Sequence, residues 1–395
     1  MQSQFLRVHN SVLGIVLLIH GASAFALLPD VQENQYLQGL ARALHQYERL
    51  QQAGGWPTIP TGNPIKPGVS DPRVPVVRRR LAITGDYTGT LSDNPKYDRA
   101  TVDAVVGYQS RNGQEPDGVL GKSSISSLNI SAQQRVEQIA HNIARWNRMP
   151  GLLGPRYVLV NMAGFELEGV EDGQVQLDMR VVVGTRYHET PIFSDIIRTI
   201  EVHPYWNVPA SIARNEFVPT YIKSTANAIA QGFEIVREGV VAPLDSVDWK
   251  TYRGKPLPFR IRQRPGPTNA LGEMKFLFPN VHNVYLHDTS ARSLFGRTVR
   301  TFSHGCVRIE NPAALATFLT AGDPTWTEEN IRTALASKRS VTIPLRAPMP
   351  VHLVYMTAWL DRSGRVQFRP DIYGRDATLA KELLRDKFQR QGPTS

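Results

Sequence analysis

The feature that most limits the fold is a change of hydrophobic period near residue 150. Between Ser131 and Asn147 apolar side chains recur at helical spacing, and Ser131 with Gln134 forms a capping box that starts the helix. From Arg156 onward apolar residues alternate instead with a period of two, which is typical of strands with one buried face. The chain is therefore predicted to be a multidomain α+β protein, helical first and then a β domain.

The helical part divides further at proline- and glycine-rich stretches. Residues 27–72 are predicted to be a helical scaffold segment followed by a linker that begins at about residue 58. Residues 73–130 are predicted to form a small helical module, in which Asp117 and Gly118 mark a tight turn before the last short helix. Residues 131–155 are predicted to be a second scaffold helix and its exit.

The sheet domain is predicted to span residues 156–376, and residues 377–395 are predicted to be a C-terminal helix and tail. Strands are expected within four segments, residues 157–160, 175–183, 283–287 and 351–359. A long stretch at about 208–268 holds one helix-like segment and several prolines. Because loops of this length inside a compact domain are usually functional, we expect a lid or an inserted capping subdomain there.

The first 26 residues are predicted to be a secretory signal peptide. Arg7 and His9 precede a short apolar run, and small residues follow at Ala22, Ala24 and Ala26. An uncleaved anchor is the alternative, but the run is shorter than the roughly 20 residues that span a bilayer. We therefore expect an exported protein with no membrane span after cleavage of the signal.

The charge balance indicates an anionic partner without identifying it. The chain has 45 Lys and Arg against 35 Asp and Glu, a formal net charge of +10. Nucleic acid, acidic lipid and a carboxylate-rich polymer would all suit this charge, although export argues against nucleic acid. The His and Cys residues lack zinc-site spacing, and the glycines form neither a Walker nor a Rossmann pattern, so neither a metal nor a cofactor is expected.

The single cysteine is the most informative residue for function. Cys306 cannot form an internal disulfide, so in an exported chain it is inert, intermolecular or reactive. His287 lies 306 − 287 = 19 positions upstream, a spacing that allows two neighbouring elements to bring an imidazole to the thiol. His304 is the alternative base, because residues two apart on a strand share a face. The N–H groups of Gly305 and Cys306 are candidate oxyanion donors, and Arg308 is a candidate carboxylate ligand.

The segment Ser303-His304-Gly305-Cys306-Val307-Arg308, preceded by His287, resembles the signature of the L,D-transpeptidase family. The resemblance extends to other motifs, which include Pro204-Tyr-Trp-Asn-Val-Pro209, Leu271-Gly272-Glu-Met-Lys275 and Tyr285-Leu-His-Asp-Thr289. It points to the larger subgroup whose catalytic domain carries an inserted capping subdomain, and it implies that the β-sheet of this domain is mixed. The pattern around Tyr108-Gln109 and Asp117-Gly118 is similar to the three-helix peptidoglycan-binding module of wall enzymes, which here either grips glycan or serves as a scaffold.

This resemblance implies a role for each residue of the site. Cys306 would be the nucleophile and His287 its base, while Ser303, His304 and Gly305 would support the loop and the oxyanion site. The residues that would contact substrate are Arg308, Ser303, Tyr285 and Trp206. The implied reaction is formation of 3-3 cross-links between peptidoglycan stem peptides in the periplasm, through a cysteinyl thioester with release of D-Ala.

Several alternatives stay open at this level. With water as acceptor the same site would be an L,D-carboxypeptidase, and with an anchored lipoprotein it would be an anchoring transferase. A non-catalytic wall-binding protein with a vestigial Cys306 is the alternative from another class. The sequence decides neither the acceptor nor the oligomeric state.

Overall fold

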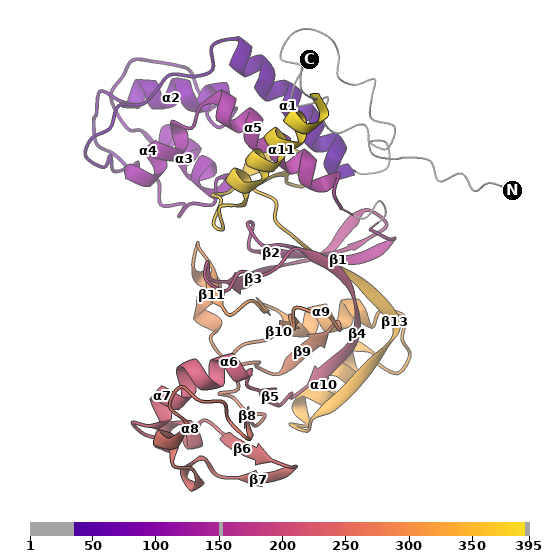
Figure 1. The fold of residues 1–395 in the computed structure, drawn as a ribbon. Coiled ribbons are helices and arrows are strands. Elements are labelled where there is room, and N and C mark those ends of the chain that lie inside the picture. The colour runs from indigo at the N-terminus through magenta and orange to yellow at the C-terminus, as the bar shows by residue number, and fades with distance from the viewer. Residues whose placement is uncertain (1–34, 150–152, 392–395) are drawn as a thin grey trace, which may run out of the picture. The chain divides into compact units, whose positions relative to one another are not determined.

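The computed structural model describes residues 35–149 and 153–391, and the predicted signal peptide lies outside these ranges. The described residues form two compact units (Figure 1). One combines residues 35–149 with residues 355–391, and the other comprises residues 153–354. Among the described residues, no helix has both the length and the apolar character needed to cross a membrane.

Two long helices form the scaffold of the first unit. α1 (Gln35–Gln52) packs along α5 (Ala132–Trp146), and the rings of Tyr36 and Trp146 stack at 4.7 Å between centroids. The predicted capping box is confirmed, since Gln134 N–H donates to the Ser131 hydroxyl and the Gln134 side chain accepts from Ser131 N–H.

The small helical module consists of α2 (Val74–Ile83), α3 (Arg99–Arg111) and α4 (Lys122–Leu128). Its core also takes in Ile59 and Ile65, which are fully buried, and Ile65 pairs with Leu120 through backbone hydrogen bonds. The linker predicted at 58–72 is therefore part of the module, to which its two isoleucines anchor it.

The Tyr108-Gln109 pair is occupied by contacts inside the module. Tyr108 shares a hydrogen bond with the Ser127 hydroxyl, and the Gln109 amide donates to Asp117 while accepting from Gly118 N–H. Gln109 therefore holds the 117–119 turn against α3, and Tyr108 holds α4 there.

The end of the chain belongs to the first unit, which corrects the predicted domain boundary at residue 376. A hairpin of β14 (Ala358–Leu360) and β15 (Val366–Phe368) precedes α11 (Arg375–Gln391). Phe368 packs edge-on against Tyr47 at 5.5 Å and lies 4.1 Å from the Arg135 guanidinium. The apolar run 351–359, in which strand structure was predicted, contains the end of β13 (Val341–Val354) and the start of β14 at Ala358. Its two halves belong to the cores of different units.

The second unit is built on a mixed sheet, as predicted, and this sheet has nine strands. The strand order is β11-β3-β12-β10-β9-β4-β13-β1-β2, and β3 also pairs with β2, so the sheet closes on itself. Its strands are β1 (Arg156–Asn161), β2 (Glu166–Glu171), β3 (Gln174–Gly184), β4 (Phe193–Val202), β9 (Met274–Leu277), β10 (Leu286–His287), β11 (Thr301–Ser303), β12 (Val307–Ile309) and β13 (Val341–Val354). Apolar residues with no exposed surface fill its interior, among them Val160, Ile200, Phe276, Leu286 and Val307.

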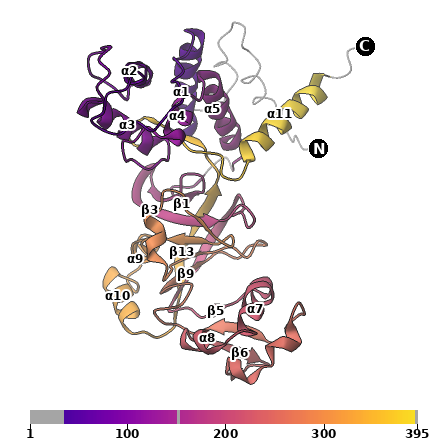
Figure 2. The ribbon, with the colours of Figure 1, turned by 90° about the vertical axis from the view of Figure 1, so that its left-hand side faces the viewer.

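Two helices, α9 (Pro312–Leu319) and α10 (Glu328–Ala336), lie together beside this sheet (Figure 2), and the short turn η5 (Arg292–Gly296) follows β10. The predicted start of α9 is confirmed, because the Asn311 side chain accepts a hydrogen bond from Ala314 N–H and Pro312 opens the helix.

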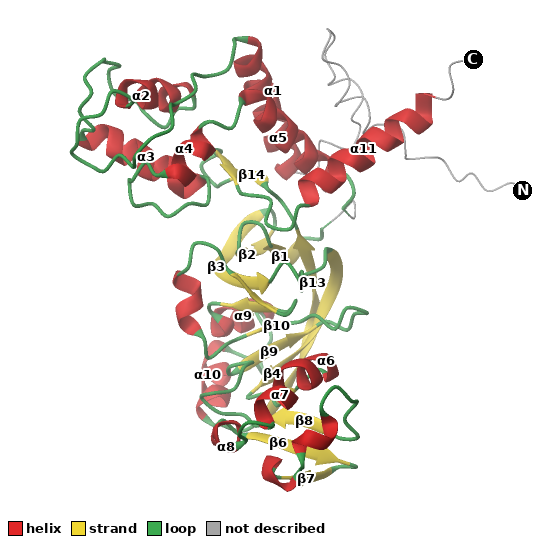
Figure 3. Ribbon diagram, turned by 60° about the vertical axis from the view of Figure 1, so that its left-hand side comes forward, coloured by secondary structure: helices red, strands yellow, loops and turns green. Residues whose placement is uncertain are grey.

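A small subdomain, here named the cap, is inserted between β4 and β9 and spans residues 206–263. Its four-stranded sheet has the order β5-β8-β6-β7 and is flanked by short helices (Figure 3). The elements are β5 (Trp206–Asn207), α6 (Ala210–Ile212), the π-helical turn η2 (Ala213–Phe217), α7 (Val218–Tyr221), α8 (Ala226–Ala230), β6 (Phe233–Arg237), β7 (Val240–Ala242), η3 (Leu244–Ser246), η4 (Trp249–Tyr252) and β8 (Arg260–Gln263). Val218, Leu244 and Ile261 are buried in a core of its own.

Candidate active site

Two neighbouring parallel strands place four polar or reactive side chains on one face. Leu286 of β10 pairs with Val307 of β12, so His287 lies opposite Arg308. Because side chains alternate along a strand, Tyr285 and His287 share a face, as do Cys306 and Arg308. The regular strand is shorter than the predicted 283–287, since only Leu286 and His287 make the ladder and the preceding residues form a loop.

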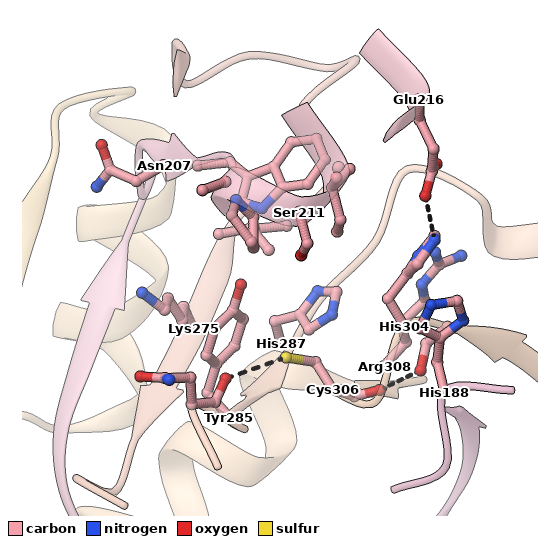
Figure 4. A pocket seen from close by; sticks show the side chains of 18 of the residues that line it. His188, Asn207, Ser211, Glu216, Lys275, Tyr285, His287, His304, Cys306 and Arg308 are labelled. Carbon is pink, nitrogen blue, oxygen red and sulfur yellow. Dashed lines mark hydrogen bonds and ion pairs between the residues drawn. The ribbon is translucent and has the colours of Figure 1, made fainter. Parts of the chain in front are cut away.

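These side chains form the floor of a cavity of about 720 Å³ whose roof comes from the cap (Figure 4). The roof residues lie between Trp206 and Phe217. Of the eight residues predicted for the site, seven line the cavity, namely Trp206, Tyr285, His287, Ser303, His304, Cys306 and Arg308. Gly305 lies in the turn between two of them.

The His287 imidazole is held in one tautomer. Its Nδ1 lies 2.5 Å from the backbone carbonyl oxygen of Asp288, so the Nδ1–H donates and Nε2 keeps its lone pair. Burial, together with the nearby charges of Arg308 and Lys275, lowers the pKa of His287 to about 3. The ring is therefore neutral at physiological pH and able to accept a proton.

Cys306 has a thiol rather than a thiolate in this environment. Its Sγ donates to the backbone carbonyl oxygen of Asn283 at 3.8 Å. Burial raises the pKa of Cys306, and hydrogen bonding to Tyr285 and the charges of Lys275 and Arg308 offset only part of that rise. The resting pair is thus a neutral thiol and a neutral imidazole.

Asp288 fixes the position of the histidine that precedes it. Its carboxylate accepts from Glu273 N–H and from Arg292, each at 2.8 Å, while its carbonyl takes the His287 Nδ1–H. Gly272 has φ +58°, and a Cβ there would lie 2.2 Å from an Asp288 carboxylate oxygen. Glycine is therefore required at 272 for this carboxylate to reach the adjoining turn.

The turn before the cysteine is locked by two hydroxyl groups. Gly305, at φ +112°, donates its N–H to the Ser303 hydroxyl, which in turn donates to the Cys306 carbonyl oxygen. The buried Thr190 hydroxyl donates to the Gly305 carbonyl oxygen at 2.9 Å. The predicted oxyanion role of Gly305 N–H does not fit this turn, because that group is already bonded. Among the described residues Cys306 N–H has no acceptor, and it remains a candidate donor.

His304 faces the cap rather than the base position. Its Nε2 lies 2.7 Å from Oε1 of Glu216, and its ring packs against His188 at 4.9 Å between centroids. Because this ring is already paired with Glu216, the geometry favours His287 over His304 as the partner of Cys306.

Cations and aromatic rings complete the floor. Arg308 is half-buried, and its Nε has no hydrogen-bond partner among the described residues. Lys275 lies 3.5 Å from a Glu201 carboxylate oxygen and 4.5 Å from the centre of the Tyr285 ring. Burial raises the pKa of Tyr285, so its phenol is neutral. Trp206 forms an apolar wall on the cap side of the cavity, packed edge-on against Phe217 at 5.8 Å.

Comparison with known families agrees with this geometry. Residues 155–326 match the model of the L,D-transpeptidase catalytic domain, and residues 70–128 match that of a peptidoglycan-binding domain. The chain contains an L,D-transpeptidase catalytic domain. This domain holds Cys306, His287 and the other predicted site residues, and the binding-domain match covers α2 to α4.

The similarity to individual proteins is limited in sequence identity or in the length covered. A curated protein of Haemophilus influenzae, whose name assigns it provisionally to the L,D-transpeptidases, is 38% identical over 224 residues; the match covers 56% of this chain and 45% of that protein. The L,D-transpeptidase of Xylanimonas cellulosilytica is 18% identical, with 75% of this chain and 99% of that one covered and a TM-score of 0.25. The L,D-transpeptidase of Stackebrandtia nassauensis is 15% identical, with 75% of this chain and 96% of that one covered and a TM-score of 0.27.

The structure adds four residues of this L,D-transpeptidase domain that the sequence analysis did not assign to the site. Lys275 lies inside a quoted motif, so the motif could have indicated it. Thr190, Asn283 and Glu216 belong to loops or short turns and carry no pattern that singles them out. Glu216 is 88 positions from its partner His304, a separation that only the inserted cap bridges.

Proposed function

We propose that this protein is a cysteine acyltransferase that joins peptidoglycan stem peptides through 3-3 cross-links. The observation that carries the proposal is the shared face of β10 and β12, where the Cys306 thiol and the neutral His287 imidazole line one cavity beside the unpartnered Arg308 Nε. The donor would be a tetrapeptide stem and the acceptor an amine on a second stem.

The first half of the reaction forms a thioester. As the donor binds, the Cys306 proton moves to His287 Nε2, and the thiolate attacks the carbonyl carbon between the third stem residue and the terminal D-Ala. The oxygen becomes negatively charged, and Cys306 N–H is positioned to donate to it. His287 then gives its proton to the D-Ala nitrogen, the C–N bond breaks, and D-Ala leaves.

The second half releases the product. The acceptor nitrogen attacks the thioester carbonyl carbon and forms a new amide bond, while the C–S bond breaks. A proton from that nitrogen returns to Cys306 through His287. Arg308 would bind the carboxylate of the departing D-Ala, since a guanidinium with a free N–H group matches a carboxylate. Tyr285 and Trp206 would line the peptide chain with apolar surface.

We further propose that the protein works in the periplasm in contact with the wall. The matched peptidoglycan-binding domain at 70–128 and the net charge of +10 both support contact with an anionic, peptide-bearing polymer. Export itself rests on the sequence pattern of residues 1–26.

The test is incubation of the purified protein with tetrapeptide-stem muropeptides, followed by mass spectrometry. Release of D-Ala together with dimers joined through their third residues is the expected result. Release of D-Ala with tripeptide stems alone would identify a carboxypeptidase. Binding to sacculi without any release of D-Ala would contradict the proposal and leave a wall-binding protein.

A further inference from the structure

The charges around the cavity are distributed unevenly. Lys275 and Arg308 contribute positive charge to its floor, while Glu216 is the one acidic side chain among its lining residues, which all lie in the described part of the chain. Figure 4 shows Lys275 and Tyr285 on one side of Cys306, with His304, Glu216 and Arg308 on the other. Glu216 is therefore the carboxylate in this lining that a cationic part of a substrate would meet.

Glu216 is fixed in place on the cap side of the cavity. It belongs to η2, where the next residue, Phe217, packs edge-on against Phe233 at 5.0 Å and against Trp206 at 5.8 Å. One carboxylate oxygen pairs with His304 Nε2 at 2.7 Å, and no described residue donates a hydrogen bond to the other. The side chain is 47% exposed, so a ligand in the cavity can reach it.

The second half-reaction creates a need that the floor does not meet. A primary amine of ordinary basicity has a pKa of about 10.4 and is an ammonium at neutral pH. Such a group is repelled by Lys275 and Arg308, and it cannot attack the thioester until it loses a proton. A base must therefore take one proton from it, and a carboxylate nearby would attract the ammonium.

We propose that Glu216 and His304 form the binding site for the acceptor ammonium, an inference that rests on the proposed transferase function. With its Nε2–H donating to Glu216, His304 keeps a lone pair on Nδ1. The free oxygen of Glu216 binds the ammonium, and His304 Nδ1 accepts one of its protons. Because the His304 side chain is 40% exposed, that proton passes on to solvent.

Both protons that the acceptor nitrogen loses are then accounted for. The ammonium gives its first proton to His304, and the lone pair freed on nitrogen forms the C–N bond as the C–S bond breaks. The second proton passes through His287 Nε2 to the sulfur of Cys306. The two histidines thus transfer different protons. His287 transfers the proton that Cys306 loses and regains, and His304 takes the first proton of the acceptor ammonium. Since His304 precedes Cys306 by two residues across the Gly305 turn, both protons are handled at the same thioester.

The experiment compares Glu216→Gln with the matched control Glu238→Gln, which changes an exposed cap carboxylate outside the cavity lining. Each variant is acylated with a tetrapeptide-stem muropeptide and offered either a D-amino acid, whose amine is protonated at pH 7, or hydroxylamine, which is neutral there. The ratio of transfer to hydrolysis is measured by mass spectrometry. Release of D-Ala in a single turnover reports the acylation step separately.

Glu216→Gln is expected to lower the transfer ratio about five- to tenfold for the D-amino acid. The ratio for hydroxylamine should not fall, the deficit should narrow as pH rises toward the amine pKa, and Glu238→Gln should match the parent. Equal losses with both acceptors would mean that Glu216 only positions the cap, and this would overturn the proposal. Unchanged transfer to the D-amino acid would overturn it as well. A parent that forms no thioester would instead refute the transferase function at the earlier step.

Discussion

The floor and the roof of the cavity are built in opposite ways. On the floor, His287 and Cys306 lie on or beside buried strands. The Asp288 carbonyl oxygen fixes the imidazole, and the Ser303 hydroxyl fixes the Gly305 turn. On the roof, the cap has a separate core and meets the signature loop through the pair of His304 and Glu216, whose side chains are 40% and 47% exposed. The floor is thus preorganised, while this contact with the roof is open to solvent.

This difference separates two tasks of the proposed acyltransferase. Bond breaking needs groups held to a fraction of an ångström, which strand-borne residues with locked neighbours provide. Choosing the acceptor needs a surface that excludes water yet admits a second substrate, and a small subdomain with its own core suits that purpose. Changes to the floor should therefore affect rate, and changes to the roof should affect which product forms.

The largest effect is expected at the nucleophile. Cys306→Ala removes the atom that forms the thioester, so release of D-Ala and cross-linking should both fall to background. A carbapenem, as a mimic of the scissile carbonyl, should add once to the parent and not to the variant in intact-mass measurements. Binding of the variant to wall sacculi should persist. Full turnover by Cys306→Ala would disprove the assignment of the floor.

Loss of the base should cost less than loss of the nucleophile. His287→Ala removes the acceptor for the thiol proton, and general-base catalysis is typically worth about 10²- to 10⁴-fold. Single-turnover release of D-Ala measures the effect, with His304→Ala as the comparison. If His304→Ala slowed acylation as much as His287→Ala, the two histidines would not divide their tasks as the geometry indicates.

The pH dependence of thiol labelling tests the neutral resting pair. A raised pKa means that the Cys306 thiolate is lost as pH falls below that pKa, so alkylation by iodoacetamide should be slow at pH 7. The rate should rise about tenfold per pH unit and continue rising beyond pH 8.5, the ordinary thiol pKa. A plateau beginning in mild acid would instead indicate a thiolate–imidazolium pair.

Arg308 should show an intermediate effect confined to substrates that carry the carboxylate. Arg308→Ala removes a charge-assisted contact worth about 1.5–3 kcal/mol, which corresponds to roughly ten- to a hundredfold in the specificity constant. The same variant should discriminate little between a stem ending in D-Ala and one ending in its amide. A similar loss on both donors would mean that Arg308 supports the floor without binding the carboxylate.

The smallest effect on acylation is expected from weakening the roof. Ile261 is 1% exposed in the cap core, and Ile261→Ala should destabilise the cap by about 2–5 kcal/mol. Amide hydrogen exchange should quicken within 206–263 and stay unchanged in β1 and β13. The share of hydrolysed product should rise because water gains access to the thioester. An unchanged product ratio in a variant with a loosened cap would argue against water exclusion by the roof.

The sequence predicted the parts of the site that are local along the chain. Cys306 and Arg308 lie two residues apart within one motif. Outside the site, the helix starts at Ser131 and Asn311 likewise follow from residues within one turn. Such features depend on neighbours within a few positions, so spacing alone indicates them.

Features that depend on distant partners were missed. The cap strands have two to five residues, too few for an alternating pattern to stand out. Glu216 acquires its role only through His304, 88 positions away. The run 351–359 looks like one strand because apolar alternation carries no information about which core each half will enter.

The return of the chain end to the first unit has a consequence for biosynthesis. The helices α1 and α5 are made early, yet the hairpin that carries Phe368 against Tyr47 emerges more than 300 residues after α1 begins. The residues of the second unit are complete by Val354, so that unit can fold while the first still lacks the hairpin. Contacts between segments so far apart form late and slowly. The helical unit, although first in the sequence, should be the last part of the newborn chain to mature.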